Sequence, residues 1–93
     1  MIRTRFITDP NISSTINDDG GVLLDVDRGV VFSLNAVGAK VWAQLEEKKE
    51  GMTGEDLLDY MAREFNVSRQ QLQSDLHAFL KELNKRWLVQ VSN

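Results

Sequence analysis

The stretch GVLLDVDRGVVFSLNAVGAKVW, residues 21–42, contains the change of period that decides the fold. Its first part holds two runs rich in β-branched residues, 22–26 and 30–34, separated by Asp27-Arg28-Gly29. Two such runs around a short turn with glycine predict a β-hairpin. After these runs the apolar residues recur at helical spacing, and Asn35 stands where an N-cap is expected. The stretch therefore predicts an antiparallel hairpin that leads directly into a helix.

Side chains alternate between the two faces of a strand, so one face of each run is expected to point to the core. The core-facing residues predicted in this way are Val22, Leu24 and Val26, followed by Val30, Phe32 and Leu34. An earlier segment, Ile12–Ile16, alternates less regularly and ends in the turn signal Asn17-Asp18-Asp19-Gly20-Gly21. With this segment the sequence predicts a small three-stranded antiparallel sheet.

Three amphipathic helices are predicted after the sheet. The first ends before Gly51, the second begins at the capping-box sequence Thr53-Gly54-Glu55-Asp56, and the third begins at Ser68-Arg69-Gln70-Gln71. Their apolar stripes are Val37, Val41, Trp42 and Leu45; Leu57, Leu58, Met61 and Phe65; and Leu72, Leu76, Phe79, Leu80 and Leu83. Residues 87–91 are expected to form a last short strand or an extended tail on the core. The predicted fold is α+β, a small sheet followed by a three-helix bundle, close to a winged helix-turn-helix.

Composition limits the class of protein. The 93 residues are expected to form one domain, 1–93, and 42% hydrophobic with 27% charged residues is typical of a folded globular chain. The absence of cysteine excludes disulfides, thiolate nucleophiles and the usual structural zinc sites. No apolar run approaches the ~20 residues of a membrane span, and Met1–Phe6 lacks a signal-peptide stretch, which predicts a cytoplasmic protein. The net charge of −3 counts against nucleic acid as a partner.

The residues with reactive side chains do not form a catalytic set. His77 is the only histidine, and we expect it to lie at the surface without a metal. Asp25 and Asp27 are expected to form a turn and to protect a strand edge, which suits them better than acid–base work or Mg²⁺ binding. Trp42 and Trp87 each continue an apolar pattern and are expected in the core or at its rim. The sequence thus predicts neither an enzyme nor a cofactor.

What remains is a strand edge. The predicted strand of residues 29–34 carries no lysine, proline or charged residue between Val30 and Leu34, so it has none of the usual devices that block pairing. A sheet this small cannot shield both of its edges. An extended peptide could therefore add to this strand.

A longer pattern in the chain resembles the PqqD-like family. Its most specific part is Leu34-Asn35-x-x-Gly38-x-x-Val41-Trp42, and the resemblance extends from about Gly21 to Val89. The other matching residues are Leu24-Asp25, Gly29, Phe32, Thr53, Asp56-Leu57, Asp75-Leu76, Phe79-Leu80, Leu83 and Trp87-Leu88. Members of this family are the precursor-peptide recognition elements of pathways that modify ribosomally synthesised peptides.

The resemblance implies a fold, an activity and a set of partners. The implied fold is a three-stranded antiparallel sheet followed by three helices, and the implied activity is binding a leader peptide as an added strand, in a groove shared with the third helix. The residues carried over to that site are Val30, Val31, Phe32 and Ser33 on the strand and Leu72, Asp75, Leu76 and Phe79 on the helix. The implied partners are the precursor leader, a leader peptidase and a cyclase of the same pathway.

Two branches of the family stay open. In lasso peptide pathways a free-standing member serves a leader peptidase, and in pyrroloquinoline quinone biosynthesis the member is a peptide chaperone for a radical enzyme. The front of the chain lacks the Arg-Leu segment associated with the quinone branch, and Trp42 and Trp87 stand where smaller residues are common. These departures favour the lasso peptide branch.

The alternative outside the family is a winged-helix DNA-binding regulator, because the second and third predicted helices could form a helix-turn-helix. The third helix, however, mixes Asp75 and Glu82 with Arg69, Lys81 and Lys85 and has no clear basic face for phosphates. The prediction is therefore peptide binding without nucleic acid or membrane.

Overall fold

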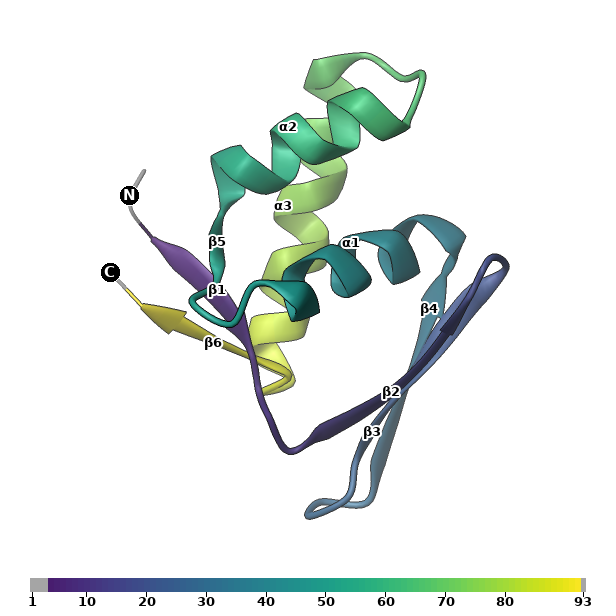
Figure 1. Ribbon diagram of the computed structural model, residues 1–93, viewed down its shortest axis with the longest axis vertical. Coiled ribbons are helices and arrows are strands. Elements are labelled where there is room, and N and C mark those ends of the chain that lie inside the picture. Colours follow the sequence, from purple (N-terminus) through teal and green to yellow (C-terminus); the bar gives the residue numbers. More distant parts are fainter. Residues whose placement is uncertain (1–3, 93) are drawn as a thin grey trace.

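The computed structural model describes residues 4–92. The prediction that the chain lacks a signal peptide rested partly on Met1-Ile2-Arg3, which lie, like Asn93, outside the described residues. In chain order the elements are β1 Arg5–Thr8, β2 Ile12–Asn17, β3 Gly20–Asp25, β4 Val30–Asn35, α1 Ala36–Glu47, β5 Met52–Thr53, α2 Gly54–Glu64, α3 Arg69–Lys85 and β6 Val89–Ser92 (Figure 1).

The strands form two antiparallel sheets, where the sequence predicted one. The predicted sheet is present as the order β2-β3-β4, and a second sheet has the order β5-β1-β6. In this second sheet Phe6 faces both Met52 and Val91, which joins three segments far apart in the sequence. The segment predicted as a final strand is confirmed as β6, whereas β1 and β5 were missed because four and two residues are too few to show a period. The α+β class with three helices is confirmed, but the winged-helix detail is not.

Each helix begins at the predicted cap. The side chains of Asn35, Thr53 and Ser68 accept hydrogen bonds from the backbone N–H three residues later, at 2.8, 3.1 and 3.2 Å respectively. The reciprocal arm of a capping box is not made by Gln71, whose side chain donates to Asp75 at 2.9 Å instead. The caps satisfy backbone donors that a helix leaves free, and they fix where each helix starts.

The core lies where α1 crosses between the β2-β3-β4 sheet and the other two helices (Figure 1). Trp42 is fully buried at its centre, as predicted, together with Leu45, Leu57 and Leu83. The Trp42 indole N–H is buried without an acceptor among residues 4–92. Burial of the ring therefore outweighs the lost hydrogen bond of its nitrogen, and the residue serves packing.

The predicted inner face of β3 is wrong. Val22 and Leu24 are exposed, as is Val26 in the following turn, and the buried side chains of the strand are those of Leu23 and Asp25. Both faces of Val22-Leu23-Leu24 are apolar, so alternation alone does not distinguish them. The core face also includes the carboxylate of Asp25. This carboxylate accepts a hydrogen bond from the Arg28 backbone N–H at 3.2 Å and is paired with the Arg28 guanidinium at 3.7 Å.

Candidate functional site: the open edge of β4

The strand β4 is an edge of its sheet, since the order is β2-β3-β4. Which of its backbone groups face outward follows from the register of the sheet. The loop between β2 and β3 has two residues and closes on the pair Asn17 and Gly20, which a two-residue hairpin joins by hydrogen bonds. Because hydrogen-bonded and non-bonded pairs alternate, Gly20 points its backbone groups to β2 and Gly21 points its own to β4.

The register then assigns every residue of β4. Gly21 pairs with Leu34, Leu23 with Phe32 and Asp25 with Val30, so these three residues of β4 bond to β3. The intervening residues, Val31 and Ser33, direct their N–H and C=O groups to the open edge.

The second hairpin supports this assignment independently. Gly29 donates its N–H to the Asp25 carbonyl at 2.8 Å, which places that carbonyl on the β4 side of β3. Gly29 has φ of 68°, a left-handed conformation that glycine adopts without a steric penalty and that closes a four-residue turn. Both turns therefore orient the Val31 and Ser33 amides toward solvent at the edge.

The side chains of β4 divide between two faces. Leu34 is buried and Phe32 half-buried, as predicted for the inner face, while Val30 at the strand start is 38% exposed. Val31, 61% exposed, and Ser33 lie on the opposite face. Of the four strand residues assigned to leader binding, two thus offer backbone groups at the edge and the other two turn toward the helices.

A groove of about 400 Å³ begins where β4 ends and runs between α1 and α3. Its lining consists of Asn35, Val37, Gly38, Val41, Met61, Asp75, Leu76, Ala78 and Phe79. Gly38 is the narrow point, since a Cβ there would lie 3.2 Å from the Phe79 ring and 3.3 Å from the Asn35 side chain. The spacing Leu34-Asn35-x-x-Gly38-x-x-Val41-Trp42 therefore has a physical basis: a strand end, a helix cap, a close approach to α3 and two core residues.

The structure separates the helix residues assigned to the site. Asp75 is exposed and Phe79 half-buried, and both line the groove together with Leu76. Leu76, 4% exposed, and Leu72, 3% exposed, belong to the core, and Leu72 is not part of the groove lining. Sequence reasoning missed Val37, which was assigned to the core and is 40% exposed. A glycine inside a helix, as at Gly38, was the available signal for a close contact at this place.

Two stacked pairs mark the other end of β4. The Arg86 guanidinium lies 5.1 Å from the centre of the Phe32 ring, and the Arg28 guanidinium lies 5.0 Å from the centre of the Trp87 ring. The prediction that Trp87 is in the core or at its rim is wrong, because the residue is 66% exposed. The turn that ends α3 places this side chain outside the core.

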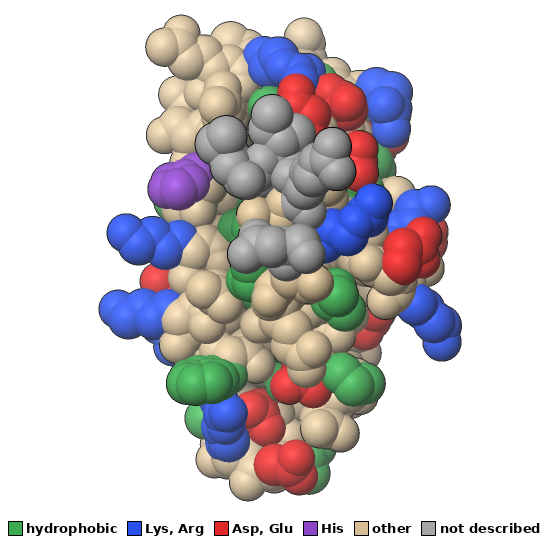
Figure 2. Space-filling view, turned by 90° about the vertical axis from the view of Figure 1, so that its left-hand side faces the viewer, with side chains coloured by type: hydrophobic (Ala, Val, Ile, Leu, Met, Phe, Trp, Pro, Cys, Tyr) green, Lys and Arg blue, Asp and Glu red, His purple; other side chains and the backbone are tan. Residues whose placement is uncertain are grey.

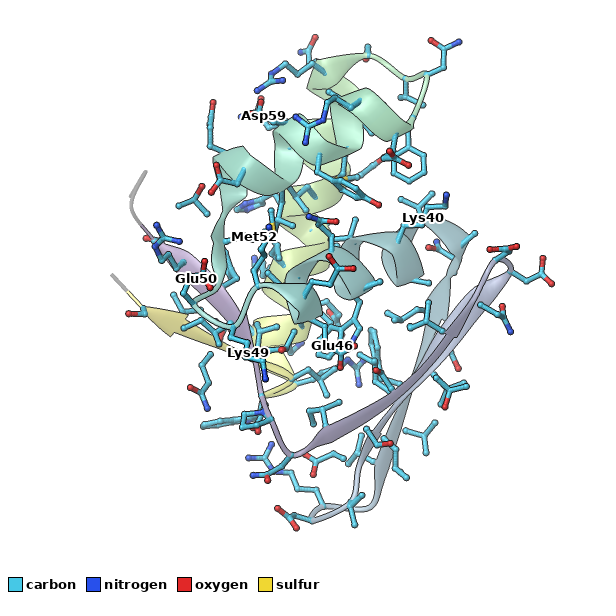
Figure 3. The ribbon with its side chains drawn as sticks, in the orientation of Figure 1. Lys40, Glu46, Lys49, Glu50, Met52 and Asp59 are labelled. Carbon is cyan, nitrogen blue, oxygen red and sulfur yellow. The ribbon has the colours of Figure 1, made fainter. Side chains whose placement is uncertain are left out.

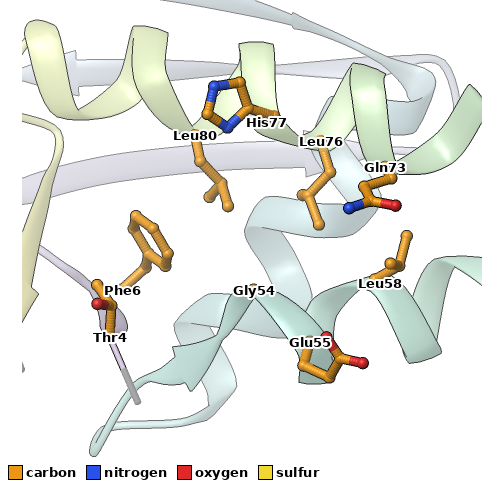
Figure 4. A pocket seen from close by; sticks show the side chains of 9 residues that line it. All are labelled: Thr4, Phe6, Gly54, Glu55, Leu58, Gln73, Leu76, His77 and Leu80. Atoms are coloured by element: carbon orange, nitrogen blue, oxygen red, sulfur yellow. The ribbon is translucent and has the colours of Figure 1, made fainter. Parts of the chain in front are cut away.

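A second cavity, of about 560 Å³, lies between β1, the start of α2 and α3, and shares only Leu76 with the groove. Its floor is apolar, with Phe6, Leu58, Leu76 and Leu80, and its rim carries Thr4, Glu55, Gln73 and His77 (Figure 4). His77 is exposed, as predicted (Figure 2). Within residues 4–92 no three His, Asp or Glu side chains gather closely enough to hold a metal ion.

Charges of both signs are interspersed over the face shown in Figure 2. At the start of α3 the Arg69 guanidinium is 2.8 Å from the Asp59 carboxylate and 3.7 Å from that of Glu55. The basic residue that begins α3 is therefore paired with two carboxylates, which counts against phosphate binding by this helix.

Burial, with Glu64 and Glu47 nearby, raises the pKa of Tyr60 above its ordinary 10.0, so this side chain is neutral near pH 7. None of the helices in the described part of the chain has the length and hydropathy for a membrane crossing.

The chain is similar to known proteins in both sequence and fold. Residues 20–89 match the family model of coenzyme PQQ synthesis protein D, PqqD. The fold is similar to that of TbiB1 in complex with the TbiA(beta) leader peptide, at 32% identity and a TM-score of 0.77 over 90% of this chain and 94% of that one. It is also similar to lasso peptide synthetase B1 complexed with the leader peptide, at 27% identity and a TM-score of 0.74 over 92% of this chain and 98% of that one. No curated protein matches the sequence significantly. The family match over most of the chain, which includes both β4 and α3, establishes that this chain belongs to the PqqD family.

Proposed function

We propose that the chain binds the leader segment of a ribosomally synthesised precursor peptide in lasso peptide biosynthesis, by adding it as a strand to β4. The observation that carries the proposal is the open edge of β4, where Val31 and Ser33 present backbone donors and acceptors next to the α1–α3 groove. Main-chain pairing is indifferent to sequence, so side-chain selectivity falls to the groove. Two similar proteins of known structure each hold a leader peptide.

The opposite edge of the sheet suits a peptide less well. On β2 the Ser14 hydroxyl lies 2.9 Å from both carboxylate oxygens of Glu46, which ties this strand to the end of α1. Glu46 is labelled in Figure 3. The N–H of Ile12 is already used, because it donates to the Asp9 carbonyl at 3.1 Å. Side chains and local turns thus occupy part of the β2 edge, whereas the β4 edge adjoins a groove.

The role proposed for the chain is recognition without chemistry. It presents the bound leader to a separate leader peptidase and cyclase of the same pathway, and it carries out no bond cleavage itself. Similarity to two leader-bound proteins, one of them a lasso peptide synthetase B1, supports this assignment, and so does the lack of a clustered acid, base and nucleophile in the groove lining.

The test compares proline substitutions on the two edges. Val31→Pro removes an N–H that faces the open edge and keeps every bond to β3, while Ser14→Pro removes an outward N–H from β2. The precursor is identified as a short reading frame next to the gene for this chain. A labelled synthetic copy of its leader is titrated with each protein, and the mass of the precursor is followed in the same mixtures. We expect Val31→Pro to weaken binding at least tenfold, because the leader loses a hydrogen bond and keeps an unpaired carbonyl. Ser14→Pro should bind like the unmodified chain.

Circular dichroism and thermal unfolding first establish that both variants are folded. Equal binding by the Val31→Pro and unmodified chains would exclude strand addition to β4. Failure of the unmodified chain to bind the leader would exclude the function, and a change in precursor mass with this chain alone would exclude the non-catalytic role.

A further inference from the structure

Trp87 has a backbone conformation that is unfavourable for its side chain. Its φ is 64°, in the left-handed region, where a bulky residue is strained by contact between Cβ and the backbone. It is the only residue other than glycine with positive φ among residues 4–92. Such strain persists only where the surrounding structure imposes it, and it is frequent at binding sites.

The end of α3 explains the conformation. The Trp87 N–H donates to the Asn84 carbonyl at 3.1 Å and the Leu88 N–H donates to the Leu83 carbonyl at 3.0 Å. These two bonds are the pair that defines a Schellman turn, in which the left-handed position is usually glycine. The turn requires positive φ at residue 87, but nothing in it requires an indole. A reason for tryptophan must therefore come from the side chain.

The indole is exposed and contacts the turn that precedes β4. It is 66% exposed, and the Arg28 guanidinium from the β3–β4 turn stacks on it at 5.0 Å. The preceding residue, Arg86, covers the Phe32 ring on the inner side of β4. Phe32 lies on β4 and Arg28 in the turn that leads into it, so the two stacked pairs connect the end of α3 to the strand and to the turn before it.

A strand added to β4 would place every second side chain on this inner side, about 7 Å apart. One such side chain would lie next to the Phe32 ring that Arg86 covers. The next one toward the β3–β4 turn would lie toward the Arg28–Trp87 pair. A flat ring backed by a guanidinium favours an aromatic or large apolar side chain, because it offers apolar area and a π-face at low cost in conformational entropy.

We propose, on the basis of the leader-binding function above, that Trp87 and Arg28 form a specificity subsite for one aromatic or large apolar leader residue at the Val30 end of β4. The strained backbone is retained because the indole contributes to binding. This subsite is separate from the α1–α3 groove, which begins at the Asn35 end of the same strand.

Replacement of Trp87 by glycine should raise the stability of the fold and lower its affinity for the leader. Trp87→Gly relieves the strained backbone and is expected to raise Tm by roughly 2–5 °C, while leader affinity falls about tenfold. Trp87→Asn tolerates positive φ without a ring and should bind as weakly as the glycine variant. Trp87→Phe keeps a ring and should recover part of the affinity. A residue with a purely structural role would change Tm and leave affinity unaltered.

An alanine scan of the same synthetic leader completes the test. With the unmodified chain, truncating one aromatic or large apolar leader residue at the Val30 end should lower the affinity about tenfold. With Trp87→Gly the same truncation should lower the affinity less than about twofold. Full leader affinity of Trp87→Gly and Trp87→Asn would overturn the subsite. So would independent effects on affinity of the leader truncation and of Trp87→Gly. If Val31→Pro weakens binding in that case, the leader-binding function stands and only the subsite fails. A leader that does not bind the unmodified chain excludes both.

Discussion

The two edges of the β2-β3-β4 sheet are strands of equal length, each joined to β3 by a hairpin, yet they differ in how they are covered. On β2, Ser14 is tied to Glu46 of α1. Within the described chain no side chain of another element hydrogen-bonds to residues 30–34, and the nearest cover is the stack of Arg86 on Phe32. An edge that no other element covers is open to pairing, so this difference supports β4 as the edge proposed for binding.

Beyond the edge substitutions, the largest loss of leader affinity is expected from Phe79→Ala in the groove next to β4. The ring lies against Gly38 in the α1–α3 groove, and removing it should lower leader affinity about tenfold while costing about 2 kcal/mol of unfolding free energy. Isothermal titration with the leader and urea unfolding measure the two quantities.

Phe65→Ala is the matched control. Phe65 is also half-buried against the core, but it ends α2 and does not line the groove. It should lose similar stability and keep full affinity. Equal losses of affinity in both variants would show that binding depends on general stability, and the distinction between the groove and the rest of the core would fail.

A smaller effect is expected from salt. In the proposed mode main-chain pairing and apolar contacts carry the binding, so affinity should change less than about threefold between 50 and 300 mM salt. Binding to phosphates would lose orders of magnitude over the same range, because counterions are released. A steep decline with salt, measured by titration at several ionic strengths, would assign the binding to charged surfaces in place of the β4 edge.

Much of the fold could be predicted because its signals are local. Asn35, Thr53 and Ser68 fix the three helix starts through side-chain bonds to nearby backbone, and such bonds leave a sequence signature. The short strands β1 and β5 have no comparable signature, because their pairing depends on segments far away in the chain. The inner face of β3 was assigned wrongly because it includes the buried carboxylate of Asp25. Local bonds to Arg28 stabilise this carboxylate, and the residue pattern does not reveal them.

The candidate site was predictable to a similar extent. An unblocked strand could be identified from residues 29–34, and its position at the sheet edge is confirmed. The helix side was harder, since Leu72 and Phe79 belong to one apolar stripe, and only packing separates the buried residue from the groove residue. Trp87 could not be placed from its apolar neighbours, because the turn after α3 directs it outward. The leader-contacting residues as a set remain a prediction.

Residue-resolved amide hydrogen exchange, with and without the leader, tests the central claim most directly. The account predicts that the leader slows exchange of the Val31 and Ser33 amides at least tenfold, because these two amides face the open edge and gain partners. The Phe32 amide, already bonded to β3, should change little, and the Ser14 amide on β2 should not change. Slowed exchange at Ser14 with Val31 and Ser33 unaffected would contradict the account, because the leader would then occupy the other edge.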